Sequence, residues 1–183
     1  MSGIEIHGYA IVSLDDRIAD HEGRFPKALM NDADWAYFQA ELDLCALTVL
    51  GHASHIATPN AKNRRRVVMS RHADGLEQRD DAWWWSPARV SWSEVAARLL
   101  PEGGRVGIPG GQIAFDHFLE TGLTSFHLSR AHNVTLPEGR GVFSAVDRGE
   151  RAEDVLTRAG LVAGEERVMD AAAGVTLRVF GVG

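Results

Sequence analysis

The stretch RVGIPGGQIAFDHFLETGL, from Arg105 to Leu123, decides how the rest of the chain is read. Its first four residues are typical of a short β-strand, and Pro109 biases the residue before it toward extended backbone. Gly110-Gly111 then predicts a turn, and apolar residues recur at helical spacing as far as Gly122, where we expect the helix to end. The stretch therefore predicts a strand, a glycine turn and a helix.

A helix that follows a glycine turn in this way can serve either of two purposes. Its first turn presents unpaired N–H groups and the positive end of the helix dipole, which suit a phosphate group. The two glycines also let a ligand approach the backbone without meeting a Cβ atom. The same turn can instead do no more than pack the strand against the helix, and a Gly-Gly pair alone does not separate the two readings.

Composition limits the class of protein. The chain has 183 residues, of which 45% are hydrophobic and 24% charged, and this predicts a single globular domain over residues 1–183. A formal net charge of -6 argues against a nucleic acid or an anionic membrane as partner. Neither a signal peptide nor a membrane-spanning stretch is evident, so we expect a cytoplasmic protein. With one cysteine, and histidines that form no H-E-x-x-H pattern, we expect no metal site.

Strand-like and helix-like segments alternate along the chain. Runs rich in β-formers predict strands at 4–14, 46–50, 67–69 and 124–129. Amphipathic runs predict helices at 32–42, 91–100 and 152–159, with another beginning at 52–57, whereas 77–81 is typical of a loop. Paired strands at 166–169 and 175–180 are expected to close the chain as a hairpin. The pattern predicts an α/β fold with a mostly parallel central sheet and an antiparallel edge hairpin.

Four further motifs occur in a fixed order around this framework. They are SLDDRIA at 13–19, DWAYF at 34–38, VLGHAS at 49–54 and VVMSR at 67–71. Together with the glycine pair, they resemble the motifs of the dihydrofolate reductase-like superfamily, which includes dihydrofolate reductases and the reductase domain of riboflavin biosynthesis. The resemblance covers nearly the whole chain and implies that superfamily's three-layer α/β fold.

The resemblance also implies a function. It implies an NADPH-dependent reductase that transfers a hydride to a pterin-like or pyrimidine-type heterocycle, a small-molecule substrate. Arg71 is expected to favour NADPH over NADH, because a guanidinium group matches the geometry of the additional phosphate. The cofactor-binding residues implied by the motifs are Ile18, Ala19, Gly51, His52, Ser54, Ser70, Arg71, Gly110, Gly111, Gln112 and Ile113.

Asp34 has two possible roles. It lies three residues after Asn31, a good N-cap, and an acidic residue in the first turn of a helix can act locally on the cap and the dipole. By resemblance to the family, it is instead the catalytic carboxylate that holds the ring nitrogens of the substrate and aids its protonation.

Some residues depart from the family pattern. His52 stands where the family has a phosphate-binding arginine, Asp16 replaces a glycine, Pro109 precedes the glycine pair, and Tyr9 occupies about the place of a lysine found in many riboflavin-pathway reductases. These departures leave a second class open: a non-catalytic nucleotide-binding protein that keeps the reductase fold.

Two apolar segments bear on assembly. The strand at 175–180 and the cluster Trp83, Trp84 and Trp85 offer more hydrophobic surface than one sheet edge usually exposes. Together with the resemblance to riboflavin-pathway reductases, they predict a symmetric homodimer. The tryptophans are expected to pack in the core or at an interface, and the alternative is a surface that stacks on a ring.

Overall fold

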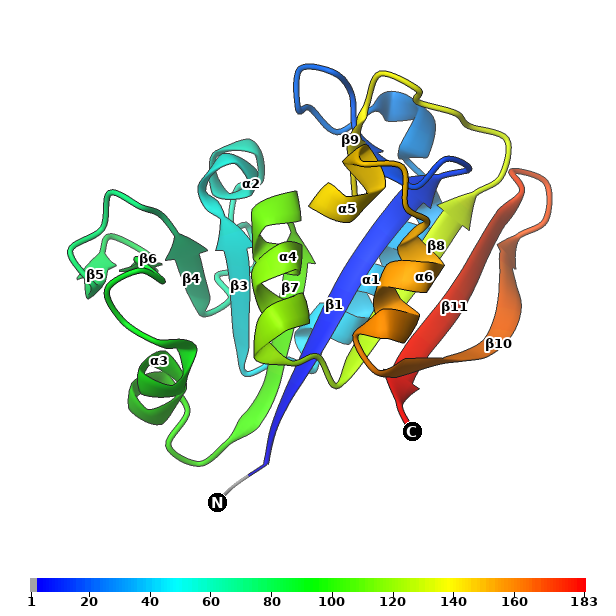
Figure 1. The fold of residues 1–183 in the computed structure, drawn as a ribbon. Helices are drawn as coiled ribbons and strands as arrows, with labels where there is room; N and C mark the ends of the chain where they lie inside the picture. The colour runs from blue at the N-terminus through cyan, green and yellow to red at the C-terminus, as the bar shows by residue number, and fades with distance from the viewer. Residues whose placement is uncertain (1–2) are drawn as a thin grey trace.

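The computed structural model describes residues 3–183, and a nine-stranded sheet runs through this part of the chain (Figure 1). Its strands are β1 (Ile4–Ser13), β3 (Leu47–Gly51), β4 (Arg66–Met69), β5 (Leu76–Arg79), β6 (Ala82–Trp85), β7 (Gly104–Gly110), β8 (Ser125–Ala131), β10 (Leu161–Asp170) and β11 (Val175–Val182). The spatial order is β10-β11-β8-β1-β7-β3-β4-β6-β5. A separate short ladder pairs β2 (Arg17–Ala19) with β9 (Arg140–Gly141).

The first strand is central, since β1 lies between β8 and β7 and is parallel to both. The ladder continues in parallel from β7 through β3 and β4 to β6, whereas β11 joins β8 antiparallel and β10 pairs antiparallel with β11. The predicted α/β fold, with its mostly parallel sheet and antiparallel C-terminal hairpin, is confirmed.

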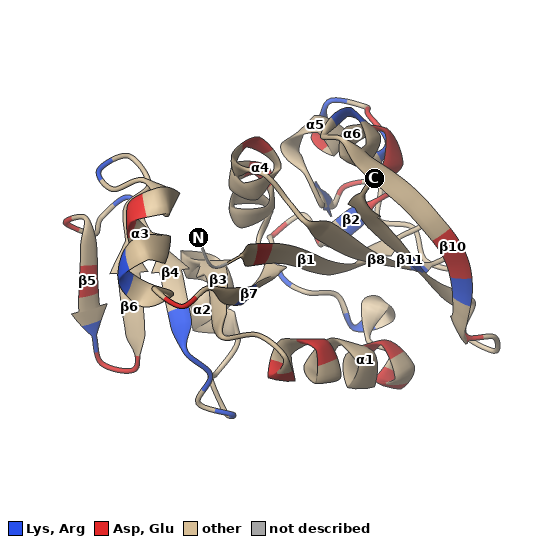
Figure 2. Ribbon diagram, turned by 90° about the horizontal axis from the view of Figure 1, so that it is seen from below, with Lys and Arg blue, Asp and Glu red and all other residues tan. Residues whose placement is uncertain are grey.

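Helices cover both faces of the sheet. They are α1 (Asp32–Asp43), α2 (His52–Ala57), α3 (Trp92–Leu99), α4 (Gln112–Thr121), α5 (Ser144–Asp147) and α6 (Ala152–Arg158), and a 3-10 turn, η1 (Lys27–Leu29), precedes α1. Figure 2 shows α1 beneath the sheet and α4, α5 and α6 above it. The three-layer arrangement is therefore confirmed, and α1 lies alone over the β1–β8 region of its face.

The glycine-turn unit folds as predicted, with β7 running into Gly111 and α4 ending at Gly122. Pro109 lies inside β7, which at first sight conflicts with the N–H group that proline lacks. The pairing of β7 with β3 explains its place, because the register shifts between Thr48 and Leu50, opposite this end of β7. The irregularity removes the need for a regular ladder bond at proline.

The segment at 77–81 is not a simple loop, since β5 occupies most of it. Its sequence LEQR lacks apolar alternation, but β5 pairs antiparallel with β6 along Leu76–Arg79. Within β6, Trp85 is fully buried, whereas Trp83 and Trp84 are partly exposed and each lies beneath a guanidinium group. The packing role predicted for the tryptophans is thus visible for Trp85.

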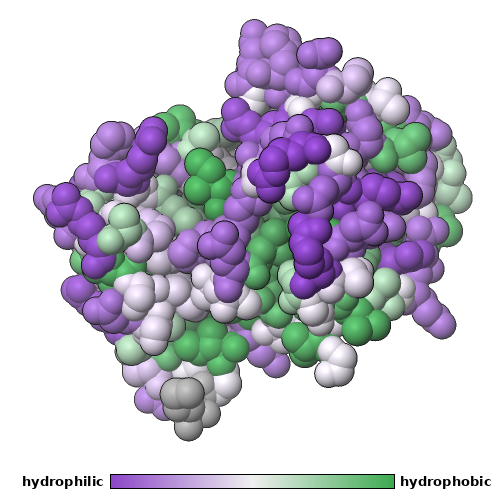
Figure 3. Space-filling model, viewed as in Figure 1, coloured by the Kyte–Doolittle hydropathy of each residue, from purple (hydrophilic) through white to green (hydrophobic). Residues whose placement is uncertain are grey.

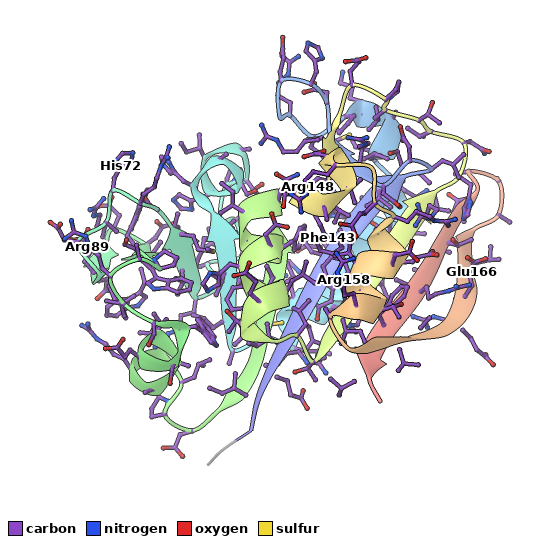
Figure 4. All side chains as sticks on the ribbon, in the orientation of Figure 1. His72, Arg89, Phe143, Arg148, Arg158 and Glu166 are labelled. Atoms are coloured by element: carbon purple, nitrogen blue, oxygen red, sulfur yellow. The ribbon has the colours of Figure 1, made fainter. Side chains whose placement is uncertain are left out.

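The apolar strand expected to lie exposed at the sheet edge is in fact internal. Val175, Leu177 and Phe180 of β11 are at most 2% exposed, and β10 takes the outer place beside β11 in the sheet. Phe180 and Val175 pack into hydrophobic clusters of the core. The outer strand β10 carries polar side chains such as Glu166, which Figure 4 labels on it. The part of the surface argument for a homodimer that rested on 175–180 was therefore wrong, and the homodimer itself stays a prediction.

The face seen in Figure 3 is a mixture of hydrophilic and hydrophobic groups. Over residues 3–183, no helix combines the length and the apolar character needed to cross a membrane.

Candidate functional site

The implied site residues gather at one edge of the sheet. Five parallel strands, in the order β8-β1-β7-β3-β4, end at this edge. Because neighbouring strands lie about 4.8 Å apart, the four intervals span roughly 19 Å, which suits an elongated ligand. Along that line, from β8 to β4, the structure places Ser129, Ile18 and Ala19, Gly110 and Gly111, Gly51 and His52, and Ser70 and Arg71.

Two glycine turns face each other in the middle of this edge. Gly111 has a φ of +90°, which L side chains rarely adopt, and a Cβ atom there would lie 3.3 Å from Ser54 Oγ and 3.7 Å from the Gly51 nitrogen. A Cβ atom on Gly110 would lie 3.5 Å from the same hydroxyl, whereas one on Gly51 would meet nothing within 4 Å. The two backbones thus approach closely around the Ser54 hydroxyl and leave Gly51 open to a ligand, an arrangement that suits a phosphate group.

The beginning of α4 is tied to the loop that follows β1. Gln112 Nε2 donates to Gly141 O at 2.9 Å and to Asp147 at 2.6 Å. Gly141 pairs with Arg17 in the β2–β9 ladder, so the chain near Ile18 and Ala19 is held close to the glycine pair. The Gln112 side-chain nitrogen therefore forms its hydrogen bonds with other residues of the protein.

The neighbouring side chains of this segment differ in their exposure. Ile18 is half-buried and Ala19 is buried, whereas Ile113, the next residue of α4 after Gln112, is 73% exposed.

The far end of the site carries an exposed cation. Ser70 is buried and its hydroxyl accepts a hydrogen bond from the His72 nitrogen, which shapes the turn after β4. Arg71 is exposed, and within residues 3–183 its guanidinium forms no ion pair. The His52 ring lies edge-on against Trp84 with 5.1 Å between ring centroids. An exposed guanidinium without an acidic partner can bind a phosphate group.

The three arginines at 64–66 do not add to the exposed positive charge of Arg71. Arg64 pairs with Asp43 at 2.7 Å, and Arg65 donates to the Leu99 carbonyl. Arg66 is buried and donates to the Thr58 carbonyl at 2.9 Å. These three side chains stabilise the protein itself.

The carboxylate of Asp34 turns away from the helix cap. Asn31 supplies the cap, because its side-chain oxygen accepts from the Asp34 backbone nitrogen at 3.0 Å. The Asp34 carboxylate instead lies next to Ser129 on β8. Burial raises the pKa of Asp34, and the influence of Ser129 opposes that rise only in part. A half-buried carboxyl with a raised pKa and no cationic partner is suited to holding a proton.

Asp16, which replaces the family's glycine, keeps the left-handed conformation that a glycine adopts easily, with a φ of 65°. Its carboxylate pairs with Arg130 and accepts from the Ala152 nitrogen at 2.9 Å, at the start of α6. The departure thus joins three segments of the chain.

Tyr9, which stands near the family's lysine, lies away from the ligand-binding edge. Its ring is buried and its hydroxyl donates to Glu41 at 3.2 Å beneath α1.

Sequence reasoning missed Ser129 and the polar residues that precede it on the same face of β8. Ser125, His127 and Ser129 are all buried, and they alternate with Phe126 and Leu128. This period-two pattern of polar residues in a buried strand was the available signal. It does not by itself say that the polar face meets α1.

Two surface hollows are not lined by the implied cofactor-binding residues or by Asp34. One is lined chiefly by 14–17 and 149–151, and the other by residues of the β10–β11 turn with His132. Within residues 3–183, no group of three or more His, Cys, Asp or Glu side chains is arranged to hold a metal ion.

Comparison with known proteins places this geometry in context. No family model matches the chain, and no curated protein matches its sequence. Solved structures do match. Dihydrofolate reductase from Enterococcus faecalis, complexed with NADP(H), superposes with a TM-score of 0.68 at 16% identity, covering 97% of this chain and 95% of that one.

Two further solved structures match with similar TM-scores. A putative riboflavin biosynthesis protein from Shewanella sp. PV-4 gives a TM-score of 0.67 at 16% identity over 97% of this chain and 98% of its own. The diaminohydroxyphosphoribosylaminopyrimidine deaminase/5-amino-6-(5-phosphoribosylamino)uracil reductase from Thermotoga maritima gives 0.65 at 16% identity, covering 98% of this chain and 57% of that one. The chain therefore has the dihydrofolate reductase-like fold.

Proposed function

We propose that this protein is an NADPH-dependent reductase that transfers a hydride to a pterin-like or pyrimidine-type heterocycle. The observation that carries the proposal is the order of groups along one sheet edge. A carboxylate with a raised pKa lies at β8, facing glycine turns follow at β7 and β3, and the exposed Arg71 follows β4.

The residues at this edge fit the parts of a dinucleotide. The Gly51–Ser54 and Gly110–Gly111 turns would hold the pyrophosphate, since they combine open backbone with the N-terminus of α4. Arg71 would hold the additional phosphate of NADPH, and the segment of Ile18 and Ala19 would lie along the nicotinamide. When bound, NADPH supplies the hydride, and the protein contributes mainly position and exclusion of water.

Reduction of a ring C=N bond needs a proton as well as a hydride. Asp34 would bind the ring nitrogens through its carboxyl group and hold that proton, because its raised pKa keeps a larger fraction protonated than for an exposed aspartate. Ser129 lies next to the carboxyl group and would orient it. The two electrons come with the hydride, and the proton passes to the ring nitrogen.

Exposed apolar side chains support a flat heterocycle as substrate. Phe25, Met30 and Trp35 are 53%, 69% and 57% exposed along the segment that leads into and begins α1. The Trp35 ring packs against Phe38, one turn from Asp34 on the same helix. Large exposed apolar groups beside a buried carboxyl are typical of a site that covers an aromatic ligand.

One observation favours the second candidate, a nucleotide-binding protein without turnover. His52 lies against Trp84 at the beginning of α2, where an arginine would supply a permanent charge toward phosphate. Such a protein would bind NADPH, but no substrate would lead it to oxidise the bound NADPH.

Thermal shift followed by a rate assay separates these candidates. NADPH, NADH, dihydrofolate and simple pterins would first be screened for an increase in melting temperature, since a ligand selective for the native state stabilises it. NADPH oxidation would then be followed with each heterocycle that binds. We expect NADPH to stabilise the protein and at least one heterocycle to support oxidation. Stabilisation without oxidation by any bound heterocycle would favour the binding protein, and no stabilisation by NADPH would contradict both.

We also propose a homodimer, in keeping with the riboflavin-pathway resemblance. The long outer strand β10 leaves one side of its backbone unpaired within residues 3–183 and is the natural place for a second copy. Light scattering at micromolar concentration should give about twice the 20.0 kDa chain mass. The mass of a single chain would refute the dimer.

A further inference from the structure

A chain of hydrogen bonds lies buried beneath α1 and takes no part in the function proposed above. Tyr37 Oη lies 2.5 Å from His127 Nδ1, and the Ser125 hydroxyl lies 3.1 Å from His127 Nε2 and 2.8 Å from His7 Nδ1. His7, Ser125 and His127 are each no more than 8% exposed. Buried polar groups are costly unless their bonds are complete, so this chain needs an explanation.

The hydrogen bonds of this chain fit a single direction that starts at Tyr37. The Arg167 guanidinium lies over the Tyr37 ring, 5.6 Å from its centroid, and we take the Tyr37 hydroxyl to donate to His127 Nδ1. His127 then carries its proton on Nε2 and donates to Ser125, which in turn donates to His7 Nδ1. Both imidazoles are neutral in this arrangement.

The last residue of this hydrogen-bond chain, His7, faces an acid. His7 Nε2 has no well-aligned hydrogen-bond partner within residues 3–183, and it lies 3.4 Å from Glu5 Oε2. A neutral His7 with its proton on Nε2 directs that proton toward Glu5.

This hydrogen-bond chain lies beside Asp34, the candidate active-site carboxyl. His127 and Ser129 are successive residues on one face of β8, about 7 Å apart along the strand. Asp34 and Tyr37, three residues apart, share one face of α1. Tyr37 bonds to His127 and Asp34 lies next to Ser129, so the same face of α1 meets β8 at two adjacent positions.

We propose that the chain Tyr37–His127–Ser125–His7 is a positioning device for Asp34, which fixes α1 on β8 and keeps a neutral imidazole next to the carboxyl group. Its purpose is electrostatic as well as mechanical. A protonated His127 would stabilise the Asp34 carboxylate and remove the proton that the proposed reaction needs. The inference rests on the proposed role of Asp34, but its test does not depend on turnover.

The surroundings of His127 keep it neutral. Burial is the largest cause and lowers the pKa of His127 to about 3, with further lowering from His7, Arg105 and Arg167. The charged and titratable groups that face this cluster are Glu5, His7 and Tyr9 from β1, Tyr37 and Glu41 from α1, Arg105 from β7, Arg167 from β10, and Cys45. Glu41 is paired with Arg105 at 3.2 Å, so the charge of this acid is already balanced.

The test is an NMR titration of the full-length protein without ligand, with labelled histidine nitrogens and aspartate carboxyl carbons. In the unaltered protein, His7 and His127 should both show the neutral Nε2–H form near pH 6, and Asp34 should titrate above the usual aspartate range. In Tyr37→Phe, the His127 midpoint should rise and the Asp34 midpoint should fall by about 0.5 unit or more. An Asp34 midpoint that does not move in Tyr37→Phe would overturn the proposal.

Tyr9→Phe is the matched control, because it removes a tyrosine hydroxyl from the same cluster that bonds to Glu41 and not to His127. It should leave the Asp34 midpoint within about 0.1 unit. A general loosening of the fold would move Asp34 equally in both variants, and that result would also contradict the proposal.

His127→Gln leaves Tyr37 in place and keeps the proposal testable if Tyr37→Phe folds poorly. It replaces a neutral imidazole by a side chain that cannot become charged, so by itself it should leave the Asp34 midpoint near its original value, and a large fall in that midpoint would contradict the proposal. In Tyr37→Phe/His127→Gln the fall in the Asp34 midpoint should be absent. If the fall persists in the double variant, the coupling does not pass through His127.

Discussion

The carboxylate of Asp34 on α1 and the hydroxyl of Ser129 on β8 lie next to each other between helix and sheet, whereas Asn31 supplies the helix cap. This proximity matters because burial raises the pKa of Asp34, and the influence of Ser129 is the one that lowers it. A residue that serves only to cap a helix would face its own backbone. Asp34 faces the sheet.

Asp34→Asn tests this relationship. Turnover of the heterocycle identified by the screen should fall by about 10²–10⁴-fold, whereas NADPH affinity should stay near its original value. Stability at neutral pH should not fall and is expected to rise, because the variant removes a carboxylate that burial disfavours. Asp32→Asn is the control, since Asp32 is an exposed acid in the same first turn. It should cost about 0.3–1 kcal/mol and leave turnover alone. The reverse pattern, with lower stability and normal turnover in Asp34→Asn, would identify Asp34 as a helix-terminal residue only.

Gly111→Ala tests the facing glycine turns. A side chain at a φ of +90° is strained, and the added Cβ would lie 3.3 Å from Ser54 Oγ. NADPH affinity should fall by about tenfold or more, corresponding to roughly 1.4 kcal/mol of lost binding. Gly149→Ala has a similar φ of +97° with nothing within 4 Å of its Cβ, so it should show the backbone strain without the loss of affinity. Calorimetric titration of both variants decides the matter. Equal affinities would show that the turn does no more than pack β7 against α4.

Arg71→Ala tests the choice of cofactor. Removal of a charge-assisted phosphate contact worth about 1.5–3 kcal/mol should erode the preference for NADPH over NADH by about 10–150-fold. Affinity for NADH should change little. Arg148→Ala removes an exposed guanidinium from the end of α5 and should leave the preference intact. If the ratio of the two dissociation constants survives in Arg71→Ala, the additional phosphate lies elsewhere.

Stability should depend on pH through His127. Its folded-state pKa of about 3 lies below the usual value of 6.5, so the unfolded chain binds the proton more readily. The stability that the neutral imidazole contributes is fully present above pH 6.5 and is lost as pH falls toward 3. Burial likewise lowers the pKa of His7, which adds to the same trend. Denaturant unfolding at pH 7 and pH 5 should show a smaller free energy at pH 5, and the difference should shrink in His127→Gln. A difference of the same size in the variant would contradict the assignment.

Asp16→Gly separates backbone conformation from side-chain pairing. Glycine suits a φ of 65°, but the change leaves Arg130 without its buried partner and the Ala152 nitrogen without its acceptor. We expect a loss on the order of 3 kcal/mol in unfolding free energy. Asp80→Gly also has a positive φ, at 48°, on an exposed turn, and should be neutral or slightly stabilising. Should Asp16→Gly prove equally neutral, the Arg130 pair contributes nothing to stability.

The order of elements could be predicted from sequence because apolar periodicity marks them strongly. The unit from β7 to α4 and the closing hairpin were predicted in type and order. The strand β5 was missed because LEQR has no apolar alternation, and its conformation comes from pairing with the tryptophans of β6. The exposed edge assigned to 175–180 was wrong for a related reason, since the sequence does not say which strand of a hairpin lies outermost.

The candidate site was predictable where a motif is local. The glycine turns, Ser70-Arg71 and Asp34 each belong to a short run of sequence, and the sheet brings those runs to one edge. Ser129 and His127 were not predictable as partners of α1, because their role depends on which face of β8 the helix covers. Contacts between distant segments are fixed by topology, which periodicity does not determine.

Binding of NADPH is the measurement that tests the central claim most directly. Isothermal titration of the unaltered protein with NADPH and then with NADH, at the same salt concentration and at pH 7, needs no knowledge of the substrate. We predict one NADPH site per chain and a dissociation constant at least tenfold lower for NADPH than for NADH, in line with a guanidinium–phosphate contact. No heat of binding with NADPH, together with no change in melting temperature, or equal affinity for the two cofactors, would contradict the account.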